Sequence, residues 1–183
     1  GVSTLVSRRG EIAHFECIGV KDKDTKAPLT HDTIFRIYSM TKPITSVALM
    51  MLYEEGKFQL NHPVANYIPE FKKLKVWAGG TAESFDTKPC ERPMTIRDLL
   101  THTSGLTYGF MMAHPVDAMY RAAGIDGANT VGMTLKEFVE KLADIPLLFS
   151  PGEQWSYSVA TDVCGRLVEI LSGMSLDEFY ATR

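Results

Sequence analysis

A hydroxyl and an amine stand three residues apart in the run Ser39-Met40-Thr41-Lys42. On a helix this spacing places both side chains one turn apart on the same face, within reach of a hydrogen bond. A serine hydroxyl becomes an effective nucleophile only when a neighbouring base takes its proton. A desolvated lysine amine suits that task because burial lowers its pKa. The spacing therefore predicts Ser39 as an acylation nucleophile and Lys42 as its activating partner.

The element that must position this pair is a helix from about Met40 to Glu55. Pro43 is tolerated only near a first turn, where backbone N–H groups have no partner within the helix, and Gly56 is a suitable terminator. Ser39 is thus expected at the helix N-terminus, where free N–H groups favour a developing oxyanion. The middle of the helix, residues 47–52, is apolar on every side and is expected to be buried all round.

A structural alternative exists for the same residues, because Ser39 would also serve as a helix cap beside a solvated Lys42. Two fixed positions in four residues arise by chance, so the motif needs support from elsewhere in the chain. Four longer blocks give that support, namely TIFRIYSMTK at 33–42, LNHPV with YIPEF between 60 and 71, IRDLLTHTSGL at 96–106 and FSPGEQWSYS at 149–158. In this order they resemble blocks of the serine β-lactamase and penicillin-binding-protein superfamily, and most closely its class C-like branch with the family VIII carboxylesterases.

The resemblance implies a third catalytic residue. In that superfamily a tyrosine in a Tyr-x-Asn box stands beside the serine and lysine and shares the proton transfer, and Tyr157 matches it. A phenol near an ammonium ionises more easily, so Tyr157 near Lys42 would act as general base toward Ser39 and later return the proton. The alternative is a packed aromatic next to Trp155. No cofactor is implied.

The chain departs from the family pattern twice. Val159 stands at the Asn position of the Tyr-x-Asn box and has no side-chain hydrogen bond to offer a substrate amide. This favours esters over β-lactams. In addition, no Lys-Thr-Gly, His-x-Gly or Trp-Gly-Gly-like third box occurs in residues 1–183. We therefore expect an N-terminal portion of the fold that lacks the C-terminal sheet strands and needs a C-terminal segment or partner chain to complete it.

The expected fold is α+β of the β-lactamase/transpeptidase type, an antiparallel sheet with packed helices plus a mainly helical region. Residues 1–56 would begin the α/β domain, 57–155 would form the helical region, and 156–183 would carry the second box and a return helix. β-Branched and aromatic residues predict strands at 2–8 and 11–20 joined by a tight turn at Arg9-Gly10. A further strand is expected at 33–37.

Helix starts are predicted by threonine or serine caps with an acidic residue three positions later, at Thr95, Thr134 and Ser175. Another helix is expected from about Thr161 to Leu171 and closed by Gly173. Residues 57–94 are rich in Pro and Gly and are expected to be mostly irregular. A structural turn is expected for Thr103-Ser104-Gly105. An apolar group is expected in the core or a lid, or as a pocket lining, namely Tyr108, Phe110, Met111, Met112 and Met119.

Composition narrows the function classes. The net charge of −3 is small and the basic residues are scattered, so no nucleic-acid partner is expected. No apolar run approaches the about 20 residues that span a bilayer, so no transmembrane segment is expected. Three cysteines and five histidines show no ligand spacing, so we expect no metal site. A bacterial cytoplasm or periplasm suits such a chain.

The sequence thus predicts a serine hydrolase that forms an acyl-enzyme at Ser39 with Lys42 and Tyr157, a carboxylesterase on small acyl esters. A β-lactamase or D-alanyl-D-alanine carboxypeptidase is the alternative with the same chemistry. A non-catalytic penicillin-recognition or sensor domain, in which Ser39 is acylated without turnover, is the alternative of another class. Small-molecule esters or β-lactam-like compounds are the expected ligands.

Overall fold

The chain folds into two compact units, Gly1–Tyr38 and Ser39–Arg183. The computed structural model describes residues 1–126 and 132–183. All three predicted catalytic residues belong to the second unit, so the candidate site is built within one unit. The finer boundaries expected after residues 56 and 155 stay a prediction, and residues 127–131 of the predicted helical region lie outside the described residues.

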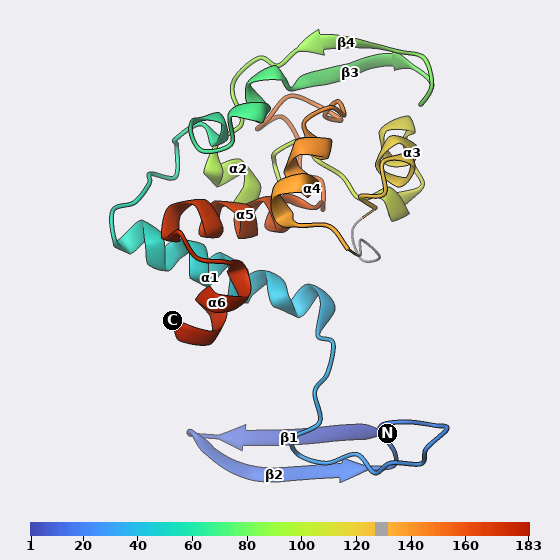
Figure 1. Ribbon diagram of the computed structural model, residues 1–183, viewed down its shortest axis with the longest axis vertical. Helices are drawn as coiled ribbons and strands as arrows, with labels where there is room; N and C mark the ends of the chain where they lie inside the picture. The colour runs from blue at the N-terminus through green and yellow to red at the C-terminus, as the bar shows by residue number, and fades with distance from the viewer. Residues whose placement is uncertain (127–131) are drawn as a thin grey trace. The chain divides into compact units, whose positions relative to one another are not determined.

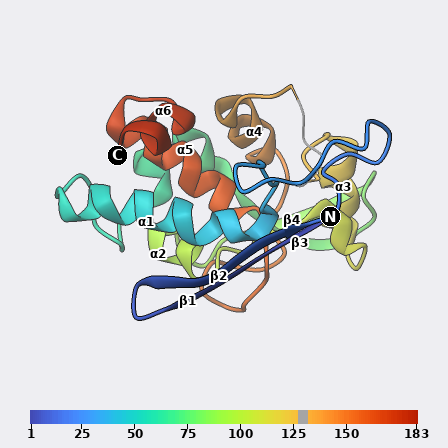
Figure 2. The same cartoon turned by 90° about the horizontal axis from the view of Figure 1, so that it is seen from below.

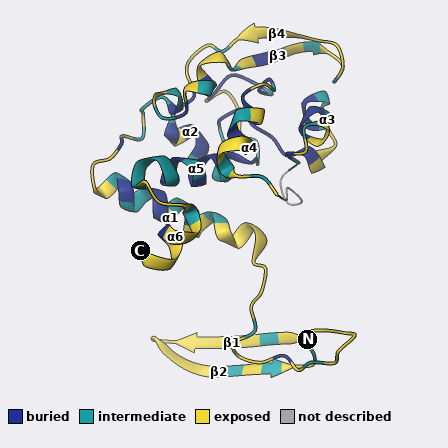
Figure 3. Cartoon of the chain, viewed as in Figure 1, coloured by how far each residue is buried: buried dark blue, intermediate teal, exposed yellow. Residues whose placement is uncertain are grey.

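The first unit is a hairpin of β1 (Val2–Arg8) and β2 (Glu11–Ile18), paired antiparallel from Val2↔Ile18 to Arg8↔Glu11 (Figure 1). Arg9 and Gly10 both have positive φ, +54° and +84°, which a tight two-residue turn requires. The predicted hairpin is confirmed. Figure 3 shows it mostly exposed, and its apolar side chains are uncovered.

The prediction of a strand at 33–37 is wrong. These residues belong to no strand, and Ile34 is 96% exposed. A β-branched run becomes a strand only where another strand pairs with it, and no strand or bridge of the described residues pairs with 33–37.

The second unit is built around the central helix α5 (Ala160–Ser172), which packs against four other helices (Figures 1 and 2). Val163, Leu167 and Val168 of α5 are fully buried, and they lie at the centre of the apolar core. The neighbours of α5 are α1 (Thr41–Glu54), α2 (Ile96–Leu100), α4 (Leu135–Leu142) and α6 (Leu176–Thr182).

The predicted caps are confirmed. Thr95, Thr134 and Ser175 each form a reciprocal capping box with the acidic residue three positions later, at the starts of α2, α4 and α6. Gly173 closes α5 with φ +73°, as predicted. Helix α3 (Pro115–Ala122) was not predicted, and its cap is His114 in place of a hydroxyl residue.

Helix α1 confirms the predicted position and corrects the predicted burial. Ala48, Leu49 and Leu52 are buried, and α1 lies beside α5. However, Ile44 is 49% and Val47 60% exposed, so the helix is not buried all round. Packing among the described residues covers only one side of α1, and an apolar sequence does not by itself supply cover for the other.

A second hairpin was not expected in the Pro- and Gly-rich segment. It consists of β3 (Lys75–Gly80) and β4 (Phe85–Pro89), paired antiparallel. Gly80 has φ +107°, and a Cβ there would lie 2.3 Å from the Ser84 carbonyl oxygen, so the turn itself requires glycine. Short 3₁₀ turns occupy Tyr38–Met40, Val64–Asn66, Pro69–Lys73 and Gly109–Met111.

Candidate active site

Ser39 lies in the 3₁₀ turn directly before α1, and its side chain is exposed. The Lys42 Nζ donates a hydrogen bond to Ser39 Oγ at 3.4 Å, across one turn as the spacing predicts. The Tyr157 hydroxyl donates a second hydrogen bond to Ser39 Oγ at 2.7 Å. The structure therefore brings together all three residues singled out from the sequence, although Tyr157 is 118 positions away from Ser39.

Tyr157 is positioned by the loop that follows α2. The backbone N–H of Ser156 donates to the His102 carbonyl at 2.8 Å, and the N–H of Val159 donates to the Thr107 carbonyl at 3.2 Å. These bonds hold the segment on both sides of Tyr157. The fully buried Ser158 adds a side-chain hydrogen bond to His102 Nδ1 at 3.3 Å. The distance between Tyr157 and Ser39 thus depends on backbone contacts between the loop after α2 and the segment before α5.

The same loop also contacts Gly152, which lies further before Tyr157, and Arg92, which precedes α2, packs on that glycine. The Gly152 N–H donates to the Thr103 carbonyl at 2.7 Å. A Cβ at Gly152 would lie 2.0 Å from the Arg92 guanidinium, so Arg92 lies directly over this glycine. Arg92 in turn forms two hydrogen bonds of 2.7 Å to the carboxylate of Asp98.

Two aromatic rings lie close to the lysine ammonium. Lys42 Nζ is 4.8 Å from the Tyr157 ring centroid and 5.4 Å from that of Tyr108. The two rings are 5.3 Å apart, and Tyr108 is buried. An ammonium at this distance from aromatic faces is attracted to them. Lys42 is therefore held by aromatic rings and hydroxyls.

The charge states differ from the sequence expectation. Burial lowers the pKa of Lys42, but the hydroxyls of Tyr108 and Tyr157 outweigh burial, and the net pKa is raised. Desolvation thus acts in the expected direction, but the expected net lowering of the Lys42 pKa is not found. For Tyr157, burial raises the pKa, whereas hydrogen bonding with Ser39 and Lys42 lowers it, and the net pKa is lowered. Lys42 is the cation of the site, and Tyr157 is the group that loses a proton more readily than usual.

Three residues near this centre were missed as site residues. Tyr108 was considered only as core, lid or pocket lining, and His102 only as one of five histidines without ligand spacing. Burial and the Lys42 charge lower the pKa of His102, which favours its neutral form. Burial raises the pKa of Asp162 in the first turn of α5, and the Lys42 charge opposes this rise. The only indication in the sequence that Asp162 could lie near the site is its place as an acidic residue at the start of an apolar helix.

Other expectations concern residues that prove to be structural. Val159 is completely buried in the core, so the position of the family asparagine presents no side chain to a substrate. Ser104 is also fully buried, and the φ of Gly105 is +83° where a Cβ would approach the Phe149 carbonyl, as a turn requires. The five apolar residues expected in the core, a lid or a pocket lining differ in burial. Tyr108 and Met119 are buried, whereas Phe110, Met111 and Met112 are exposed.

Within residues 1–126 and 132–183, no three His, Cys, Asp or Glu side chains are grouped so as to hold a metal ion. In the same ranges, no helix combines the length and apolar character needed to cross a membrane.

Comparison with known proteins agrees with the fold and the motifs. The family model described as Beta-lactamase matches residues 1–183, and the chain belongs to this family. The expected resemblance and the expected β-lactamase/transpeptidase-like α+β fold are thereby confirmed.

Three similar proteins indicate the range of the family. Esterase EstB from Burkholderia gladioli is 37% identical over 96% of this chain and 42% of its own length. The structure of EstCE1, a hydrolase with promiscuous acyltransferase activity, matches 98% of this chain and 44% of its own, with a TM-score of 0.80 and 30% identity. Simvastatin synthase (LovD) from Aspergillus terreus matches 92% of this chain and 42% of its own, with a TM-score of 0.70 and 29% identity. The chain spans about two fifths of the length of the curated relatives it matches.

Proposed function

We propose that this protein is a serine hydrolase that acts through an acyl-enzyme at Ser39, as a carboxylesterase on small acyl esters. The observation that carries the proposal is the contact of Ser39 Oγ with both the Tyr157 hydroxyl, at 2.7 Å, and Lys42 Nζ, at 3.4 Å. A nucleophile within hydrogen-bond reach of a base, with a third group that tunes the base, is the arrangement that activates a hydroxyl.

The pKa directions support separate roles within this trio. Tyr157, whose pKa is lowered, first loses its own proton to solvent, and the phenolate then takes the proton of Ser39 as the bond from Oγ to the substrate carbonyl carbon forms. Lys42, whose pKa is raised, stays positively charged and stabilises the phenolate. Tyr157 then gives the proton to the leaving alcohol oxygen as its bond to carbon breaks. In the second half of the reaction, Tyr157 takes a proton from water as the water oxygen attacks the acyl carbon. The bond from carbon to Ser39 Oγ then breaks and Oγ regains the proton, which frees the carboxylic acid and Ser39.

The surroundings of the trio favour an ester with an apolar portion. The ring of Phe110 stacks on Tyr108 at 4.7 Å, and the ring of Trp155 stacks on Tyr157 at 6.5 Å. Phe110 and Trp155 are 51% and 67% exposed, so these aromatic faces are open to a ligand. Aromatic surfaces of this kind bind apolar groups. The buried Val159 offers no amide to recognise a β-lactam or peptide, which places β-lactamase or D-alanyl-D-alanine carboxypeptidase activity second.

Transfer of the acyl group to an alcohol in place of water is a second candidate. It is favoured by the exposed Ser39 and by the similarity to EstCE1 and to simvastatin synthase. An added alcohol that increases release of the leaving group and yields a new ester would support this candidate.

Active-site labelling tests the proposal directly. A fluorophosphonate probe followed by peptide mass spectrometry should place the adduct on Ser39, because this is the serine that contacts both Tyr157 and Lys42. Ser7→Ala serves as a control that should keep the adduct on Ser39, since Ser7 is exposed and belongs to the first unit. An adduct on another serine would sink the proposal.

Substrate comparison tests the ester assignment. We expect p-nitrophenyl butyrate to be cleaved much faster than nitrocefin, and the reverse order would refute the carboxylesterase. A burst of one product equivalent without steady-state turnover would instead indicate the non-catalytic sensor domain.

A further inference from the structure

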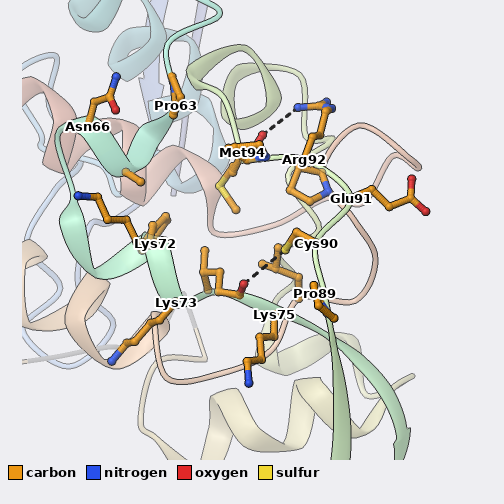
Figure 4. A pocket seen from close by; sticks show the side chains of 16 residues that line it. Pro63, Asn66, Lys72, Lys73, Lys75, Pro89, Cys90, Glu91, Arg92 and Met94 are labelled. Carbon is orange, nitrogen blue, oxygen red and sulfur yellow. Dashed lines mark hydrogen bonds between the residues drawn. The ribbon is translucent and has the colours of Figure 1, made fainter.

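A cavity separate from the candidate active site lies at the base of the second hairpin. Its volume is about 690 Å³, which is within the usual range for small-molecule pockets. Figure 4 shows side chains from the 3₁₀ turns at 64–73, from β3 and from the segment after β4 gathered around it. Ser39, Lys42 and Tyr157 are not among its lining residues, so this pocket is not the acyl-enzyme site.

The floor of the cavity is apolar. Phe71 and Met94 are each 5% exposed and Leu147 is 1% exposed, so their side chains belong to the core and present apolar surface to the cavity. Leu74 and several prolines continue this surface. A ligand must therefore contribute an apolar part to fill it.

The charges around the cavity are mostly positive. Four basic residues line it, and two of them are neutralised, Lys73 by Asp144 at 2.5 Å and Arg92 by Asp98 at 2.7 Å. Lys72 and Lys75 form no ion pair with any carboxylate of the described residues.

The single acidic residue of the lining has a defined place. In Figure 4, Glu91 lies on the side of the pocket opposite Lys72. A negative group in the pocket is therefore repelled from the Glu91 side and attracted to the lysine side.

We propose that this cavity binds an amphipathic carboxylate of the medium-chain fatty acid class. The alkyl chain covers Phe71, Met94 and Leu147, and the carboxylate lies at the rim away from Glu91, where Lys72 and Lys75 supply the positive charge. Lysine suits this position because its stem lines apolar surface while its charged end stays in water. The binding does not depend on Ser39 chemistry.

The chain contains a reporter for this site. Cys90 lines the cavity, and its thiol donates a hydrogen bond to the Leu74 carbonyl at 3.5 Å. Cys90 is half-buried and Cys164 is fully buried. A Cys17→Ser background therefore leaves Cys90 as the thiol that a maleimide reaches in the folded chain.

The test measures the rate of Cys90 modification in Cys17→Ser, with peptide mass spectrometry to confirm the site. Saturating octanoate, below its micelle concentration, should slow the rate about fivefold or more, because modification proceeds only from the unoccupied fraction. The Lys72→Gln/Lys75→Gln variant should lose this protection and keep the rate measured without octanoate. Lys23→Gln/Lys26→Gln, with the same charge change in the first unit, should keep the protection.

Three results would overturn the proposal. They are an unchanged rate with octanoate, equal protection by octanol at the same concentration, and protection that survives in Lys72→Gln/Lys75→Gln. The first would show that nothing binds, and the others that the carboxylate is not recognised. None of them affects the proposed ester hydrolysis, which is read from Ser39 labelling.

Discussion

Two polar clusters in the second unit, around Asp98 and around Ser39, contain similar groups but differ in burial and in how their charges are paired. Around Asp98, the carboxylate accepts two hydrogen bonds from Arg92, and others from Thr95 and Thr103. Around Ser39, the cation Lys42 has no carboxylate partner among the described residues, and the acceptors are hydroxyl groups. Asp98 is buried, whereas Ser39 is exposed. A satisfied, buried charge stabilises a fold, and an unmatched cation beside an open hydroxyl promotes a reaction.

The largest expected effect is at the open cluster. Ser39→Ala should lower ester hydrolysis by about 10³-fold or more, because the covalent intermediate can no longer form. The midpoint of thermal unfolding should not change, since Ser39 is exposed. Activity assays and calorimetry on the same preparation check both parts. A variant that hydrolyses ester at the wild-type rate would show that the nucleophile is elsewhere.

Tyr157→Phe should lower turnover by about 10²-fold, because only the proton-transferring hydroxyl is lost. The rate of the unmodified protein should rise with pH as Tyr157 ionises, with a midpoint below the ordinary tyrosine value of 10.0 because its pKa is lowered. The variant should lack this rise. A pH–rate profile of the same shape in both proteins would remove Tyr157 from the mechanism.

Asp98 provides the contrasting test of stability. Asp98→Ala leaves the Arg92 guanidinium without its partner and should lower the free energy of unfolding by about 2 to 4 kcal/mol. The pKa of Asp98 is lowered from 3.8, since its hydrogen bonds and Arg92 outweigh the opposing effect of burial. Its contribution is therefore present above about pH 4 and is lost as pH falls through the lower folded value.

Denaturant titrations at pH 7 and pH 2 measure this contribution. The difference in stability between Asp98→Ala and the unmodified protein should be smaller at pH 2 than at pH 7, because the folded pKa of Asp98 is lowered from 3.8. An equal difference at both pH values would mean that the charge of Asp98 does not stabilise the fold. At low denaturant, Ser39 labelling of the folded fraction should persist in the variant.

The smallest expected effect is that of Thr103→Val, which removes one hydrogen bond to Asp98, 3.0 Å long. We expect a loss of about 1.5 to 3 kcal/mol in the free energy of unfolding, the usual value for a hydrogen bond to a charged group. In an Asp98→Ala background the same substitution should cost less, because its partner is gone. Additive losses would show that the cluster is not cooperative.

The sequence predicted those parts of the molecule that local chemistry determines. The caps at Thr95, Thr134 and Ser175, and the Ser39-to-Lys42 spacing, depend on residues three positions apart, and the structure has them as expected. Tyr157 was found only through the resemblance, because no local pattern brings residues 39 and 157 together.

The errors have a common physical cause. The strand at 33–37, the burial of Val47 and the pKa of Lys42 all depend on neighbours distant in sequence. The hairpin β3–β4 was missed because its glycines were interpreted as breaks, whereas Gly80 enables the turn. Tyr108 and His102 lie at the candidate site because the fold brings them close to Lys42 and Tyr157, which are distant in sequence. Their immediate sequence surroundings do not indicate this.

The backbone bonds that join the loop after α2 to the segment before α5 have a consequence for thermal motion. Ser156 and Val159, on the two sides of Tyr157, are each joined to this loop by one backbone hydrogen bond, at His102 and at Thr107. These two bonds limit how far Tyr157 can move relative to Ser39. A displacement of about 1 Å at a reacting group is enough to slow chemistry about 10²-fold. Warming that loosens these bonds should therefore reduce the rate of acylation well before the helices around α5 begin to melt.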